Sequence, residues 1–146
     1  MRITFVVPGL PVAQPRSRAA SFGGKARIVG FDDRHPVTAF KAAVRLTAAA
    51  VMDGPPLTGP VRLLATFAFP RPKRLTWARR PMPRAQHVTK PDADNLMKSL
   101  CDALNGVAWV DDAQVVDARL AKCYAAGNEA PHVAVEIETI GGVPAA

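Results

Sequence analysis

The residues of this sequence best suited to chemistry are three aspartates, Asp92, Asp94 and Asp112. They lie in a chain whose formal net charge is +7, so acid is scarce and it is clustered. Carboxylates that lie close together repel one another, and a shared site therefore calls for a cation between them. Mg²⁺ is the natural candidate, because it takes oxygen ligands and keeps several waters, with Mn²⁺ as a substitute. We predict that all three aspartates are metal ligands.

The spacing of Asp92 and Asp94 agrees with a shared ion. On extended backbone, side chains two residues apart point to the same side and are separated by about 6.5 to 7 Å. That separation suits one ion held by both carboxylates, or two bridged ions. Asp94 has a rival interpretation as the N-cap of a following helix, where backbone N–H groups would hold it. The cap explanation fits Asp92 less well.

The charge of the chain is unevenly distributed along its length. Residues 1–90 contain 16 Lys and Arg against 3 Asp and Glu, a balance of +13, and residues 91–146 contain 3 against 9, a balance of −6. This asymmetry predicts that the first part meets a polyanion, for which nucleic acid is the obvious candidate, while the second supplies an acidic site. A solvated basic surface is the alternative. The candidate DNA-binding residues come from two basic segments and are Arg16, Arg18, Lys25, Arg27, Arg71, Lys73, Arg74 and Lys90.

Three neighbours of the aspartates complete the candidate site. Lys98 follows Asp94 by four residues, so it forms either a helical ion pair of roughly a few tenths of a kcal/mol or a catalytic cation at the scissile phosphate. Asn95 is a candidate to orient a metal-bound water by hydrogen bonds, and equally a residue that begins a helix. Asp111 is a second candidate for that supporting role, although paired acids commonly mark a solvated turn.

The elements that must position these residues follow from the apolar pattern. Apolar runs and alternation predict strands over residues 2–7, 61–69, 114–124 and 132–140, with a short further strand over 26–31. Helical spacing predicts one helix from Pro36 to a stop at Asp53-Gly54, and a second from Asp94 or Asn95 to Asn105-Gly106. Residues 70–90 hold four prolines and seven basic residues, which predicts a loop. A chain reversal at Gly106 would let Asp112 return beside Asp92.

Length and composition predict one α+β domain over residues 1–140, with a flexible C-terminal tail over 141–146. A chain of 146 residues that is 49% hydrophobic is long enough for one real core. Its two cysteines, Cys101 and Cys123, lack metal-ligand or redox spacing and are expected to be thiols of a reducing cytoplasm. No stretch approaches the roughly 20 apolar residues of a membrane span. We therefore expect a cytoplasmic protein without membrane contact.

The acidic segments resemble one known family. The run from Lys90 to Lys98, followed by Asp102-Ala103-Leu104-Asn105-Gly106 and by the run from Trp109 to Asp117, is similar to the RusA family of Holliday-junction resolvases. The resemblance is specific over roughly residues 88–124. It implies a RusA-like fold, here a mixed β-sheet of about four to five strands packed with two main helices.

The resemblance also implies an activity and a set of roles. RusA-like proteins are homodimeric, Mg²⁺-dependent endonucleases that nick four-way DNA junctions symmetrically during recombination and repair. By motif position, Asp92, Asp94 and Asp112 correspond to the family's essential carboxylates and Lys98 to its catalytic lysine. Two alternatives stay open from the residues alone, namely a non-catalytic basic protein that binds nucleic acid, and a metal nuclease that acts on other DNA structures.

The basic balance of residues 1–90 generates a first prediction. Binding of DNA should weaken steeply as salt is raised, because neutralising phosphates releases condensed counterions. Fluorescence anisotropy of a labelled four-way junction, measured over a series of salt concentrations, checks the slope. A flat response would argue against an interface made mainly with phosphates.

Overall fold

The computed structural model describes residues 1–15, 18–22, 25–29 and 34–141, and the two short segments among these only by their backbone. Four candidate DNA-binding residues therefore lie outside what is described, Arg16 altogether and Arg18, Lys25 and Arg27 as side chains. The predicted flexible tail lies outside it beyond Gly141.

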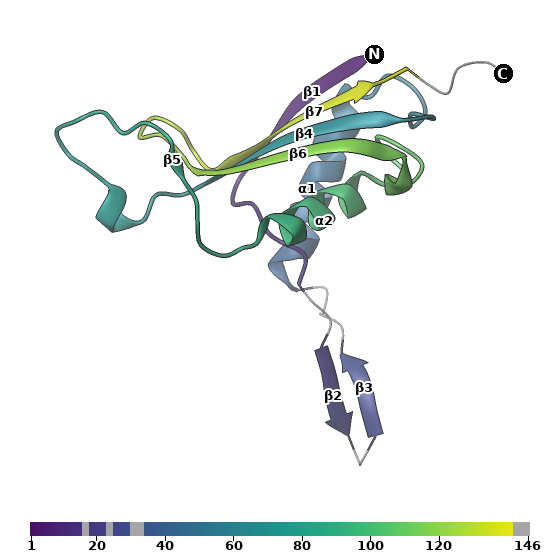
Figure 1. Cartoon of the computed structure of the whole chain (residues 1–146), viewed down its shortest axis with the longest axis horizontal. Coiled ribbons are helices and arrows are strands. Elements are labelled where there is room, and N and C mark those ends of the chain that lie inside the picture. The colour runs from purple at the N-terminus through teal and green to yellow at the C-terminus, as the bar shows by residue number, and fades with distance from the viewer. Residues whose placement is uncertain (16–17, 23–24, 30–33, 142–146) are drawn as a thin grey trace.

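A five-stranded mixed sheet forms the centre of the protein (Figure 1). The strands stand in the order β1-β7-β4-β6-β5, and β4 and β6 are parallel while the other neighbours are antiparallel. Their bounds are β1 Arg2–Pro8, β4 Val61–Phe69, β5 Ala85–Gln86, β6 Val115–Tyr124 and β7 His132–Thr139. The predicted α+β class and the strand count are confirmed.

Two helices accompany this sheet, as the apolar periodicity predicts. Helix α1, Pro36–Val51, begins with proline at its first position, and the His35 Nδ1 accepts a hydrogen bond from the Val37 N–H at 3.0 Å. Helix α2, Ala93–Leu104, ends where Gly106 adopts a φ of 79°, a left-handed conformation that suits glycine. Among the described residues, no helix has the length and apolar character needed to cross a membrane.

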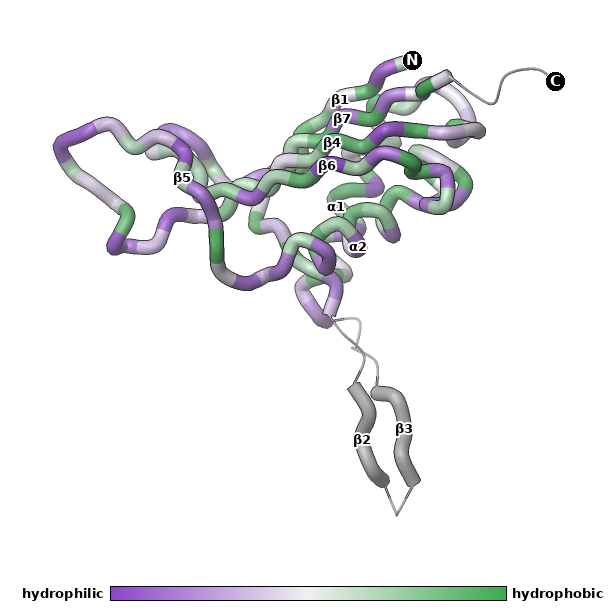
Figure 2. Tube along the Cα trace, viewed as in Figure 1, coloured by the Kyte–Doolittle hydropathy of each residue, from purple (hydrophilic) through white to green (hydrophobic). Residues whose placement is uncertain are grey.

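The core lies between the helices and one face of the sheet. Every second residue of β1 and β4 is buried there, including Phe5, Leu63 and Phe67. Buried residues of α1 and α2, such as Val44 and Leu100, join the same cluster. In Figure 2 the strands show this alternation of hydrophobic and hydrophilic residues, whereas the segment between β4 and β5 is mainly hydrophilic.

The short strand predicted over residues 26–31 corresponds to β3, Lys25–Val29. It pairs antiparallel with β2, Arg18–Phe22, in a separate two-stranded sheet. The basic segment of the N-terminal part is therefore built as a hairpin, and its strands do not extend the main sheet.

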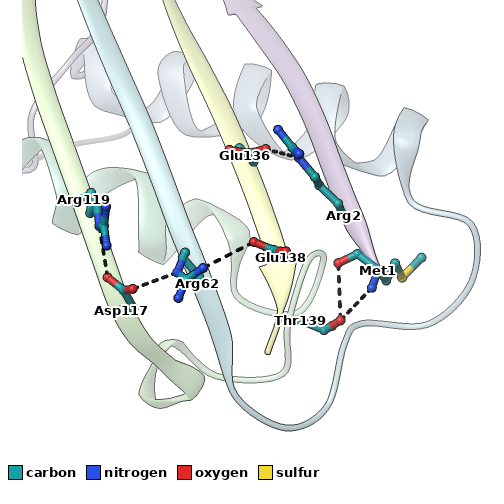
Figure 3. A network of polar contacts seen from close by, with 8 residues as sticks. All are labelled: Met1, Arg2, Arg62, Asp117, Arg119, Glu136, Glu138 and Thr139. Carbon is teal, nitrogen blue, oxygen red and sulfur yellow. Dashed lines mark hydrogen bonds and ion pairs between the residues drawn. The ribbon is translucent and has the colours of Figure 1, made fainter. Parts of the chain in front are cut away.

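The sheet face turned away from the helices carries a row of charged side chains (Figure 3). The Arg62 Nε donates to the Asp117 Oδ2 at 2.8 Å, and its Nη1 lies 3.6 Å from Glu138 on the next strand. Arg119 lies 3.6 Å from the same aspartate. The hydrogen bond from Arg62 holds the pKa of Asp117 below its usual value. Such half-exposed cross-strand pairs contribute modestly to stability and favour one register.

His87 is a buried ionisable group at the edge of the core. It follows β5, is 7% exposed, and stacks on Phe69 with ring centroids 4.3 Å apart. The His87 ring also contacts the ring of Tyr124, with centroids 4.8 Å apart. Burial lowers the pKa of His87, and the positive charge of Lys122 lowers it further. Both effects favour the neutral imidazole over its protonated form.

This burial predicts that the protein loses stability on mild acidification. Below the ordinary histidine pKa of about 6.5, His87 binds a proton more readily in the unfolded chain than in the folded protein. The free energy of unfolding therefore decreases as the pH is lowered. Urea unfolding at pH 7.5 and 5.5 should show a smaller decline for His87→Phe than for the wild type. Val133→Ala, which opens a cavity without touching a titratable group, is the control and should keep the wild-type decline.

Candidate active site

Asp92 and Asp94 lie at the start of α2. Asp92 occupies the N-cap position, yet its exposed carboxylate makes no capping hydrogen bond. Asp94 lies in the first turn, where its Oδ1 accepts a hydrogen bond from the Asn95 N–H at 2.9 Å. The helix therefore begins at Ala93, before the predicted start at Asp94 or Asn95, and the N-cap interpretation of Asp94 is wrong. Capping does not account for Asp92 either.

Asp112 approaches α2 further along the helix. It opens the short 3₁₀ helix η2, Asp112–Gln114, which contacts α2. Burial raises the pKa of the Cys101 thiol to about 12, and the nearby carboxylates of Asp112 and Asp102 add to the rise. Cys101 and Asp94 are seven residues apart, close to two helical turns or about 10 Å on the same face. Lys98 is exposed and lies between these two positions along the helix.

The structure does not gather the three aspartates into one metal-binding group. Within the residues described, no set of three or more His, Cys, Asp or Glu side chains is placed to hold a metal ion. The donors fit Mg²⁺ in type, because all are carboxylate oxygens and Asp92 is exposed and uncommitted to a cap. Metal binding by Asp92, Asp94 and Asp112 stays a prediction.

An open depression lies beside Asp92 at the start of α2. It has a volume of about 570 Å³ and is lined by Lys90, Pro91, Asp92 and Asn95. Asn95 is half-buried, and its backbone carbonyl accepts a hydrogen bond from the Gln14 N–H at 2.9 Å. Lys90 and Asn95 supply hydrogen-bond donors for a phosphate, and the Asp92 carboxylate supplies oxygens for a cation.

The basic segment between β4 and β5 forms an arm, residues 70–84, that extends beyond the end of the sheet (Figure 1). Lys73 and Arg74 lie in a short 3₁₀ helix, η1 Lys73–Leu75, and are exposed. Lys90, after β5, is exposed as well. These three predicted DNA-binding side chains are open to solvent, as contact with a phosphate requires.

Arg71, the fourth described candidate for DNA contact, braces the arm from inside. Its Nε donates to the Leu75 carbonyl oxygen at 2.7 Å, and its Nη1 donates to those of Pro83 and Ala125 at 2.7 and 3.2 Å. The guanidinium also lies 5.2 Å from the centre of the Trp77 ring. Arg71 is half-buried, so it has a structural role whether or not it contacts DNA.

The base of the arm is fastened to the turn between β6 and β7. Arg84 forms two hydrogen bonds with the Glu129 carboxylate, at 2.8 and 2.7 Å, which lower the pKa of Glu129 to about 2. The Gly127 N–H donates to the Met82 carbonyl oxygen at 2.8 Å, and a Cβ at Gly127 would lie 2.6 Å from the Met82 Cε. The arm therefore has a defined shape in the absence of DNA.

The comparison with protein families covers both helices, the acidic segments and every strand of the main sheet except β1, of which only Pro8 is included. Residues 8–138 match the family described as Endodeoxyribonuclease RusA. The chain belongs to the RusA family. The resemblance seen in the acidic segments is thereby confirmed, and it extends over most of the chain.

A curated relative is similar to this chain over nearly the whole length of both proteins. The uncharacterized protein YqaN from Bacillus subtilis (strain 168) is 35% identical over 145 residues, which cover 94% of this chain and 96% of the relative. Membership of the RusA family identifies this chain as an endodeoxyribonuclease. All of the predicted metal ligands and Lys98 lie inside the matched range.

The turn that presents Asp112 in this RusA-family chain is built by Asp111 and Gln114. The Asp111 side chain accepts the backbone N–H of Gln114, and the Gln114 Oε1 accepts the N–H of Asp111 at 3.0 Å. The Gln114 Nε2 donates to the Leu57 and Gly59 carbonyl oxygens, both at 2.9 Å. Asp111 thus has a capping role, and Gln114 is a positioning residue that the sequence prediction missed, although Asp-x-x-Gln is a capping-box pattern.

The bonds made by Gln114 predict its contribution to stability. Gln114→Ala should lower the free energy of unfolding by about 1–3 kcal/mol, because it leaves partly buried backbone groups without their partners. Gln86→Ala, at an exposed position of β5, is the matched control and should change it by less than about 0.5 kcal/mol. Urea titration measures both variants. Equal losses would contradict the assigned role.

Proposed function

We propose that this protein is a Mg²⁺-dependent endonuclease that resolves Holliday junctions by paired symmetric nicks during DNA recombination and repair, in the cytoplasm. The observation that carries the proposal is the start of α2 in a RusA-family chain. There the exposed Asp92, whose side chain makes no capping hydrogen bond, lines a depression together with Lys90, and Asp94 and Lys98 follow it in the first two turns of the helix. Carboxylates placed among cations are what hydrolysis of a phosphodiester needs.

Asp92, Asp94 and Asp112 would hold the divalent ion in this proposal. A bound Mg²⁺ supplies Lewis-acid stabilisation of the phosphate and a lower pKa of the attacking water. The contribution of the chain is to fix the carboxylates. Asp92 and Asp94 are attached to a helix whose Leu96 and Leu100 are fully buried, so the backbone beneath them is held in place. Asn95 would orient water through hydrogen bonds.

Lys98 would stabilise negative charge during cleavage. It is exposed on the helix face between Asp94 and Cys101, the residue that Asp112 approaches. An ammonium at that position can contact a non-bridging phosphate oxygen, or the 3′ oxygen as it leaves. The Lys98 side chain is long and exposed, so its ammonium could reach the phosphate of bound DNA.

The substrate and the assembly follow from symmetry and charge. A four-way junction has two-fold character and needs two matched cuts, which a C2 homodimer with two identical acidic sites provides. Lys73, Arg74 and Lys90 would contact backbone phosphates, together with the predicted residues Arg16, Arg18, Lys25 and Arg27. Such contacts position DNA and carry little sequence information.

The decisive experiment is cleavage of a mobile four-way junction by the wild type and by Asp92→Asn. With Mg²⁺ the wild type should nick two opposite strands, and Asp92→Asn should lose at least about 100-fold in rate while it still binds the junction. Ca²⁺ in place of Mg²⁺ should support binding without cleavage. Glu138→Gln, which removes an acid on the opposite face of the sheet, is the control and should cleave normally.

Two outcomes separate the rival functions. Junction binding by a wild type that shows no cleavage with Mg²⁺ or Mn²⁺ would indicate a non-catalytic DNA-binding protein. Equal nicking of the junction and of a linear duplex with the same sequence would indicate a metal nuclease without junction selectivity. Analytical ultracentrifugation of the free protein and of the complex tests the homodimer.

A further inference from the structure

Lys122 on β6 lies on the side of the sheet that faces the core, where a charged side chain is uncommon. In the parallel pairing of β4 and β6 its partner is Phe67, which is fully buried on that face. The Lys122 Nζ donates two hydrogen bonds to backbone carbonyl oxygens, to Thr89 at 2.9 Å and to Pro91 at 2.8 Å. Its charge is thus directed at the segment that leads into α2.

The two hydrogen bonds from Lys122 hold the segment that follows the last paired residues of β5 and β6. The pairing of β5 with β6 stops at Gln86 and Cys123, and one long bond of 3.4 Å follows, from the His87 N–H to the Lys122 carbonyl oxygen. Residues 88–90 are then exposed. An exposed segment without a backbone ladder opens most readily, so the side chain of Lys122 restrains the part of the chain that ends at Asp92.

Other contacts hold the helix that follows. The Gln14 N–H donates to the Asn95 carbonyl oxygen at 2.9 Å, and the Ser99 Oγ donates to that of Val12 at 2.8 Å. Leu96 is fully buried beneath the first turn. The body of α2 is therefore fixed without Lys122. What Lys122 adds is the position of residues 89–91, on which the direction of the Asp92 side chain depends.

We propose that Lys122 is a positioning residue of the acidic site, which acts by fixing the backbone that carries Asp92. The inference rests on the proposed function, in which Asp92 binds metal next to the cleaved phosphate. A displacement of about 1 Å in a positioning group costs on the order of 100-fold in rate. Affinity for DNA is spread over many phosphate contacts. Loss of the Lys122 donors therefore lowers kcat and leaves junction affinity nearly unchanged.

The test compares Lys122→Met, which keeps the length of the side chain and removes its donors, with Lys122→Arg, which keeps a cation with donors. Lys122→Leu is a second variant without side-chain donors, for use if methionine at this position prevents folding. Arg119→Met is the matched control, because Arg119 lies on the same strand with a side chain that is 72% exposed. Each variant is measured for single-turnover cleavage with saturating Mg²⁺, for junction Kd in EDTA, and for amide hydrogen exchange in residues 88–92.

Lys122→Met should cleave about 10- to 100-fold more slowly than the wild type, with faster exchange over residues 88–92 and a Kd within about twofold. Lys122→Arg should restore most of the rate, and Arg119→Met should match the wild type in rate and exchange. Unchanged exchange, an unchanged rate, or a Kd that rises as much as the rate falls would each overturn the proposal. A wild type that does not cleave would overturn the proposed function instead, and the exchange measurement needs neither metal nor DNA.

Discussion

The packing of α2 against the sheet is the constraint on which the candidate site depends. Leu96, Leu100 and Leu104 recur about once per turn and are fully buried, which fixes the rotation of the helix about its own axis. Side chains seven residues apart share a helix face, so the same packing sets the direction of Asp94 and Cys101. The chemistry of the site is oriented by apolar side chains that take no part in it.

The basic side chains of the arm have two different tasks. The guanidinium groups of Arg71 and Arg84 each make several internal hydrogen bonds and give the arm its shape. A planar group with five donors suits that bracing. The exposed Lys73 and Arg74 are then carried on a rigid support, which lowers the entropy cost of meeting a phosphate.

The sequence predicts the long elements well and the local contacts poorly. Alternation locates β4 at residues 61–69, and Pro36 marks the first residue of α1, because these signals are strong and local. The start of α2 is predicted to within one or two residues, but its N-cap residue is misassigned, because aspartate is favoured both at an N-cap and in a first turn. The placement of Asp112 along α2 depends on tertiary packing. The hydrogen bonds of Lys122 have no sequence signature, because their acceptors are backbone carbonyls that every residue carries.

The parallel pairing of β4 with β6 has a consequence for how such a protein can diversify. Parallel neighbours cannot be joined by a tight turn, so a long crossover is obligatory. Here residues 70–114 make that crossover, and they contain the arm, β5 and α2. Insertions or deletions in the arm would change how far the arm extends from the sheet. The register between β4 and β6 would stay the same. The helix that carries the candidate site and the length of the arm can thus vary independently within one connection.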